Sequence, residues 1–146
     1  MRTLGLDVGD KRIGIAISDP HGRIAVPVRT YQRRGAGDIA TLIELAGRED
    51  VQRIVVGLPY SLDGTIGPQA RLSERFAAQL RATGTIEVVL WDERFTSREA
   101  DLQMRAAGKR GKKAKAERDA VAASIILQTY LDSHGAASLL PPWDGA

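Results

Sequence analysis

Two apolar runs separated by a short polar turn open this chain and constrain its fold more than any other stretch. The runs span residues 3–8 and 12–18, are rich in Leu, Ile and Val, and flank the turn Gly-Asp-Lys. A third run, 24–30, follows the turn sequence Asp-Pro-His-Gly. Short β-forming runs joined by glycine-containing turns are typical of β-hairpins. The chain is therefore expected to begin with three antiparallel strands.

The remainder of the chain alternates helical and strand patterns. Apolar residues at helical spacing predict helices, and two short buried runs predict strands. The predicted helices are 38–50, 68–84, 96–107 and 115–134, and the predicted strands are 53–59 and 86–91. This order predicts an α/β fold with a mixed five-stranded sheet and helices on both faces. A doubly wound nucleotide fold would instead begin with a glycine-rich turn into a helix.

Length and composition exclude several classes of protein. A chain of 146 residues fits one domain, 1–146, with a single core. It contains no cysteine, which rules out disulfides, thiolate nucleophiles and the usual structural zinc sites. No run of about 18 apolar residues occurs, so no membrane span is expected and the protein is expected in the cytoplasm.

Positive charge is concentrated in one segment. Residues 105–118 carry seven Lys and Arg residues against one acid, although the whole chain has a net charge of only +3. Such a segment suits contact with a polyanion, and the alternative is a solvated loop. Basic side chains in this segment and near the acids Asp7 and Glu93 are expected to bind the substrate. They are Lys11, Arg12, Arg94, Lys109, Arg110, Lys112 and Lys113.

Asp7 interrupts the first apolar run. Strand alternation places Asp7 on one face with Gly5 and Gly9, while the flanking apolar residues face the other way. The glycines would leave bare backbone around the carboxylate, as a site for a bulky polar group requires. The alternative is an Asx-type turn residue.

Three further acids lie at the end of a predicted strand or within the last predicted helix. Asp92 and Glu93 end the strand at 86–91, where alternation does not decide which one faces the sheet; as an alternative, they could complement a helix dipole. Asp119 continues the apolar stripe of the last helix, so its charge needs a cation. That cation is either a metal ion shared with other acids or a basic side chain such as Lys11 or Arg12.

Three acids on three separate elements, beside a basic segment, predict a divalent-metal site for phosphodiester chemistry. Hard oxygen ligands favour Mg²⁺ or Mn²⁺. Two such ions would activate water and stabilise the leaving oxygen in an in-line displacement.

The chain closely resembles the YqgF family, also called RuvX. The resemblance rests on four segments in order: DVGDKRIGIAISD at 7–19, VVGLPYSLDG at 55–64, DERFTSREA at 92–100 and RDAVAASIILQTYLD at 118–132. These Holliday-junction-resolvase-like proteins are described as pre-16S rRNA nucleases. The resemblance also implies an RNase H-like fold.

The same resemblance implies roles for individual residues. Asp7, Glu93 and Asp119 match the catalytic, metal-binding acids. The GLP…DG loop, which contains Gly57 and Gly64, is expected to shape the cleft. Related resolvases carry a fourth acid one helical turn beyond the last-helix acid, where this chain has Ala122.

Four functions remain open at this stage. The first is a metal-dependent nuclease that processes the 5′ end of pre-16S rRNA, as a monomer or homodimer. The second is a dimeric resolvase of four-way DNA junctions, which would use the same acids. An ATP-binding fragment of the actin and sugar-kinase type is disfavoured by the short chain. A catalytically idle RNA-binding module would show salt-sensitive binding without turnover.

Overall fold

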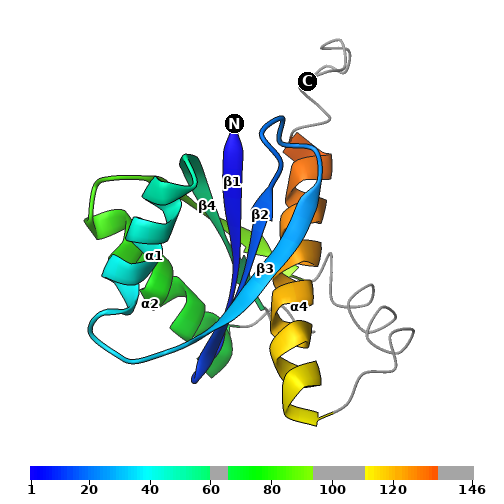
Figure 1. Cartoon of the computed structure of the whole chain (residues 1–146). Coiled ribbons are helices and arrows are strands. Elements are labelled where there is room, and N and C mark those ends of the chain that lie inside the picture. Colours follow the sequence, from blue (N-terminus) through cyan, green and yellow to red (C-terminus); the bar gives the residue numbers. More distant parts are fainter. Residues whose placement is uncertain (60–65, 94–110, 135–146) are drawn as a thin grey trace.

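The computed structural model describes residues 1–59, 66–93 and 111–134, with side chains from residue 118 onward in the last segment. Figure 1 shows the arrangement of its helices and strands. In chain order these are β1 (Arg2–Val8), β2 (Arg12–Ser18), β3 (Ala25–Gln32), α1 (Asp38–Arg48), β4 (Val51–Leu58), α2 (Pro68–Ala82), β5 (Glu87–Asp92) and α4 (Gly111–His134).

The five strands form one mixed sheet in the order β3-β2-β1-β4-β5. Strands β1, β2 and β3 pair antiparallel, whereas β4 pairs parallel with both β1 and β5. Short turns can join only antiparallel neighbours, and helical crossovers bring the later strands in parallel. The predicted mixed five-stranded sheet is confirmed.

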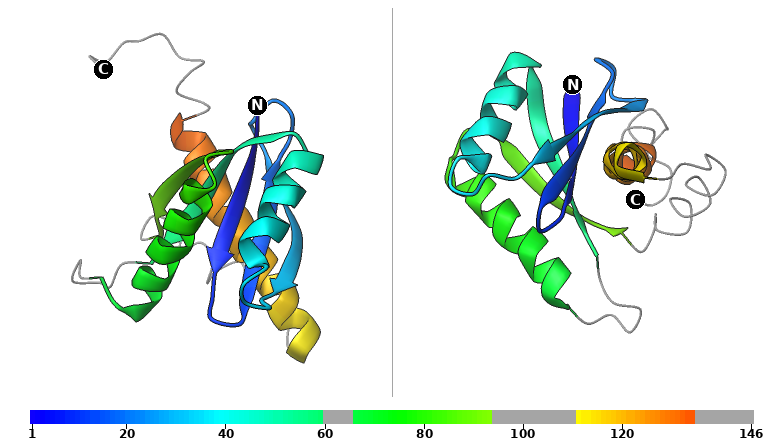
Figure 2. Two further views of the ribbon diagram at one scale, coloured as in Figure 1. Left: turned by 90° about the vertical axis from the view of Figure 1, so that its left-hand side faces the viewer. Right: turned by 60° about the horizontal axis from the view of Figure 1, so that its bottom comes forward.

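Helices cover both faces of this sheet, as predicted. Figure 2 shows α1 and α2 on one face and α4 across the other. The larger core lies under α1 and α2 and includes Leu6, Ile15 and Phe76. The smaller core lies under α4 and joins Val55 to Ile126 and Leu127. The acid at position 7 lies between two residues of the larger core, so its side chain points toward α4.

The turn between β2 and β3 is organised by Asp19. Its carboxylate accepts hydrogen bonds from the backbone N–H groups of Arg23 and Ile24, at 2.7 and 2.8 Å. Gly22 has a φ of 71°, which favours glycine because it lacks a Cβ. The predicted turn at Asp-Pro-His-Gly is thereby explained by side-chain capping of the backbone.

Most predicted boundaries lie within about two residues of those observed, as is usual for frayed ends. The exception is α4, which begins at Gly111 rather than near residue 115. Lys112 and Lys113 therefore belong to a helix, not a loop. Lysine and alanine both favour helices, and this propensity outweighs the repulsion between like charges that indicated a loop.

Several predictions lie outside the described residues. These are the helix at 96–107, the irregular tail, and the residues Gly64, Arg94, Lys109 and Arg110. Among the described helices, none is both long and apolar enough to cross a membrane.

Candidate active site

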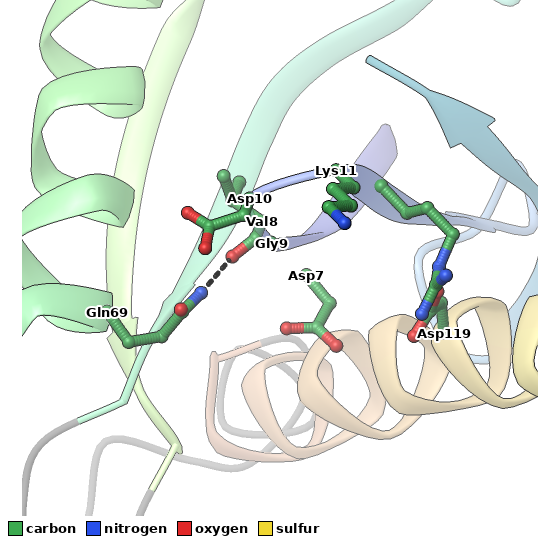
Figure 3. Close-up of a pocket in the computed structure, with 8 residues that line it drawn as sticks. Asp7, Val8, Gly9, Asp10, Lys11, Gln69 and Asp119 are labelled. Carbon is green, nitrogen blue, oxygen red and sulfur yellow. Dashed lines mark hydrogen bonds and ion pairs between the residues drawn. The ribbon is translucent and has the colours of Figure 1, made fainter.

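Asp7 lies near the carboxyl end of the central strand β1. Across the antiparallel pair it faces Gly14 of β2, and the adjoining Leu6 and Val8 are buried in the core on the opposite face. The Asp7 side chain is partly buried and lines a cleft of about 360 Å³ at the open end of the sheet. Figure 3 shows Asp7 beside α4, with Asp119 on that helix. The predicted facing of Asp7 is confirmed.

The glycines around Asp7 do not serve the role predicted for them. A Cβ on Gly5 would lie 2.7 Å from the Leu127 Cβ and 3.1 Å from the Ala123 carbonyl oxygen. Gly5 is therefore covered by α4 and allows the helix to approach the sheet closely, rather than leaving backbone open to a substrate. Gly9 does line the cleft, in the turn that follows β1. The interpretation of Gly5 as access for a ligand was wrong because alternation identifies a face but not what covers it.

Glu93, rather than Asp92, lies over the α4 face of the sheet. A Cβ placed on Gly57 would meet both the Glu93 Oε2 and the Ile126 Cδ1 atoms at 2.7 Å. Ile126 belongs to α4, so the Glu93 carboxylate and the helix approach the same side of β4. Gly57 leaves the space that this carboxylate occupies, in agreement with the cleft-shaping role expected for the GLP segment. The structure thereby resolves which of the two adjacent acids joins Asp7.

Asp119 lies on the sheet-facing side of α4, in line with the buried residues Ala123, Ile126 and Leu127. Its Oδ2 accepts a hydrogen bond from the Arg12 Nε at 2.7 Å, which forms an ion pair between α4 and the start of β2. Arg12, one of the basic side chains expected as an alternative to a metal ion, therefore forms an ion pair with Asp119. Lys11 also lines the cleft beside it.

Asp7 interacts electrostatically with each of the other two acids. Burial raises the pKa of Asp7 to about 6, and repulsion by Asp119 adds to this increase. Burial also raises the pKa of Glu93 to about 8, with further contributions from Asp7 and Asp92. Mutual repulsion requires proximity, so these shifts place Asp7 within electrostatic reach of both partners. The site concentrates negative charge that the fold does not fully compensate.

The raised pKa values predict how stability varies with pH without metal. The folded protein retains protons on Asp7 and Glu93 that the unfolded chain loses near pH 4, so the contribution of these two groups to stability is fully present below that pH and is lost as pH rises through about 6 and then 8. We expect the melting temperature of the metal-free protein to fall by roughly 10 °C between pH 5 and 8.5.

Differential scanning calorimetry in EDTA would measure this fall. The double variant Asp7→Asn/Glu93→Gln should flatten it, because neither amide titrates. If the melting temperature fell equally with pH in the wild type and the variant, the pH dependence would belong to other groups. A rise in stability over the same range would contradict the raised pKa values.

The chemistry of the donor set fits a hard divalent cation. Asp7 on β1, Glu93 just after β5 and Asp119 on α4 lie at the same end of the sheet, and the raised pKa values of Asp7 and Glu93 mean that positive charge beside them would stabilise their ionised forms. Within the described parts of the chain, no three acidic or histidine side chains yet converge closely enough to share an ion. A site made by all three acids requires Asp119 to exchange Arg12 for the cation.

Sequence reasoning missed two residues that line this cleft, Asp10 and Gln69. The Gln69 Nε2 atom donates a hydrogen bond to the Val8 carbonyl oxygen at 2.6 Å, which links the start of α2 to the end of β1 (Figure 3). Gln69 follows Pro68 at the helix start, a position with no local signal of function. Only the long-range contact reveals it.

Comparison with known proteins identifies the family. The model of the RuvX family, described as Holliday junction resolvase, matches residues 1–133. The chain belongs to the RuvX family. The resemblance inferred from the four sequence segments is thereby confirmed, and a hydrolytic nuclease is the class of protein that this family indicates.

Named relatives of this RuvX-family chain match over most of their length. A protein of Anaeromyxobacter dehalogenans is 47% identical over 133 residues, 90% of this chain and 97% of its own. One of Halalkalibacterium halodurans is 46% identical over 135 residues, covering 90% and 96%. Both carry the name "Putative pre-16S rRNA nuclease".

A solved structure shares the fold of this RuvX-family chain. Thermus thermophilus RuvC superposes with a TM-score of 0.57 at 14% identity, covering 93% of this chain and 97% of that one. At this identity the likeness concerns the fold alone. The RNase H-like architecture expected from the sequence is confirmed.

Proposed function

We propose that this chain is a metal-dependent nuclease that hydrolyses phosphodiester bonds and acts on the 5′ end of pre-16S rRNA in the cytoplasm. The observation that supports the chemistry is that Asp7 interacts electrostatically with both Glu93 and Asp119 at one end of the sheet. The names of the relatives support the choice of substrate.

Asp7 and Glu93 would hold the divalent ion, Mg²⁺ or Mn²⁺, and Asp119 would join them after leaving Arg12. When bound, the metal would activate water for attack and stabilise charge on the leaving oxygen. The position of the fourth acid of related resolvases is Ala122, so the chain offers three carboxylates rather than four. Burial of Asp7 and Glu93 keeps their charge in a medium of low polarity, where a cation is held more strongly than in water.

Arg12 would have two successive partners in this scheme. In the metal-free protein its guanidinium neutralises Asp119 at 2.7 Å. If Asp119 turned to a bound metal, Arg12 would be free at the edge of the same cleft, beside Lys11, where its guanidinium could bind a substrate phosphate. The metal and Arg12 therefore compete for Asp119.

This competition predicts the effect of Arg12→Gln on metal binding. Because the variant removes the competing cation, we expect Mn²⁺ or Mg²⁺ to bind roughly three- to tenfold more tightly than to the wild type, measured by isothermal titration calorimetry without nucleic acid. Arg118→Gln is the matched control, since it removes the same charge from an exposed position next to Asp119. Metal affinity that is unchanged or lower in Arg12→Gln would show that the ion pair does not compete.

The function is tested by offering two substrates side by side. Labelled pre-16S leader RNA and a four-way DNA junction are each incubated with the protein and Mg²⁺ or Mn²⁺, and with EDTA as the control. We expect metal-dependent cleavage of the RNA. Symmetric cleavage of the junction alone would favour the resolvase, which the description of the family supports and which requires a dimer. Salt-sensitive binding without cleavage of either substrate would favour an idle binding module.

A further inference from the structure

A second cleft lies beside the first and is not explained by the acids. It has a volume of about 320 Å³ and lies between the edge strand β3 and the start of α1. Six side chains line it, and none is acidic: Arg29, Thr30, Tyr31, Gln32, Arg34 and Thr41. Arg29, Gln32 and Arg34 are exposed, so two guanidinium groups and an amide face solvent there.

The nearest acid to this cleft is already neutralised. Asp38 at the start of α1 is 1% exposed and accepts hydrogen bonds from the Tyr31 hydroxyl, the Arg33 guanidinium and the backbone N–H groups of Arg34 and Gly35. These bonds hold the pKa of Asp38 below its usual value, despite its burial. Arg33 therefore supplies the counter-charge to Asp38. Among the described residues, no ion pair joins an acid to Arg29 or Arg34.

Direct contacts connect this cleft to the acidic one. Arg12 of the first cleft pairs across the sheet with Gln32 of the second, and neighbouring strands lie only about 4.8 Å apart. Arg33 donates from its backbone N–H to the Lys11 carbonyl oxygen at 2.9 Å and from its Nη1 to the Gly9 carbonyl oxygen at 3.0 Å. The connection between β3 and α1 is thus fixed against the turn that carries the acidic cleft. The two clefts open on opposite faces at the same end of the sheet, so an extended ligand that passes around the edge strand β3 could contact both.

We propose that the cleft between β3 and α1 binds the phosphodiester backbone of the nucleic acid whose scissile bond lies at Asp7 and Glu93. This inference rests on the proposed function and adds a second phosphate contact to it. Arginine pairs with phosphate through two parallel hydrogen bonds, and Gln32 and Thr41 add neutral polar groups beside the two guanidinium groups. The Tyr31 hydroxyl is committed to Asp38, and the two exposed guanidinium groups suit phosphate rather than base edges, so the contact reads the backbone rather than the sequence.

The test is a binding measurement in EDTA, where cleavage does not interfere. The affinity of a fluorescently labelled leader RNA is measured by anisotropy at several salt concentrations for the wild type and Arg29→Gln/Arg34→Gln. We expect the double variant to bind about tenfold more weakly and the slope of log K against log salt to become shallower by roughly 1 to 2, because each lost phosphate contact contributes nearly one unit. An unrelated RNA of equal length should show the same loss.

The matched control is Arg23→Gln/Arg48→Gln. It removes the same charge from exposed positions at the opposite end of the sheet, after β2 and at the end of α1. Equal weakening in both double variants would assign the effect to overall charge and overturn the proposal. Unchanged affinity in the cleft variant would also overturn it. A loss confined to one RNA sequence would contradict backbone recognition.

Two further measurements distinguish this inference from a small-anion site and from the proposed nuclease function. Titration with inorganic phosphate should show no saturable binding at millimolar concentrations; saturable binding lost in the cleft variant, with RNA affinity unchanged, would assign the cleft to a small anion. Cleavage by the wild type with Mn²⁺ tests the proposed function independently. A wild type that cleaves RNA while the cleft variant binds it normally would overturn the second contact alone.

Discussion

Asp7→Asn is expected to reduce metal-dependent cleavage by about a thousandfold or more while leaving nucleic-acid affinity in EDTA within twofold of the wild type. Loss of one carboxylate ligand removes several kcal/mol of transition-state stabilisation, and each 1.36 kcal/mol changes the rate tenfold. Asparagine keeps the shape of aspartate, so the cleft and its basic side chains remain. Single-turnover cleavage and anisotropy measure the two effects separately.

The same variant carries a signature that a structural acid would not show. Because burial and repulsion raise the pKa of Asp7 to about 6, its charge destabilises the metal-free fold at neutral pH. Asp7→Asn should therefore melt at a higher temperature than the wild type in EDTA at pH 8, and should gain less stability from added Mn²⁺. An active variant would remove Asp7 from the catalytic site. A lower melting temperature would indicate a structural role.

Gly14→Ala is the substitution expected to damage the fold most. A Cβ at this position would lie 1.9 Å from the carbonyl oxygen of Asp119, a backbone atom of α4 that no side-chain rotation can move. The helix would have to shift away from β2. Overpacking of this kind costs about 1–3 kcal/mol and sometimes more, and we expect the upper end of that range in urea unfolding. Because Asp119 itself is displaced, cleavage should fall in the fraction that remains folded.

Gly47→Ala provides the matched control for Gly14→Ala. A Cβ on Gly47 would meet nothing within 4 Å, and the residue lies in the last turn of α1. Alanine is favoured over glycine inside helices by roughly 0.5–1 kcal/mol, so this variant should be slightly more stable than the wild type. Equal unfolding midpoints for the two alanine variants would show that α4 does not approach Gly14 as closely as the structure places it.

Local patterns were sufficient for the framework of the molecule. Strand alternation oriented Asp7, and helical periodicity placed Asp119 with Ala123 and Ile126 on the face that packs against the sheet. The hairpin turns and crossover lengths then gave a mixed sheet. These features depend on neighbours a few residues apart, which is the range over which residue types and spacing carry information.

Other features of the molecule depend on contacts between residues far apart in the chain. Arg12 and Asp119 are separated by 107 positions, and Gln69 and Val8 by 61. The close approach of α4 explains why positions 5 and 14 are glycine, whereas strand alternation had led us to assign Gly5 to ligand access. The second cleft likewise combines side chains of β3 with Arg34 and with Thr41 of α1.

Residue spacing and turn chemistry established the order of the elements and the faces on which Asp7 and Asp119 lie, and four motifs indicated the family. Packing between distant elements shows that Glu93 rather than Asp92 lies on the face of Asp7, that Arg12 holds Asp119, and that a basic cleft lies at the same end of the sheet as the acidic one. The reason is physical: periodicity fixes the direction of a side chain relative to its own strand or helix. Its partner, burial and pKa depend on which other elements pack against it, and those contacts are set by the whole fold.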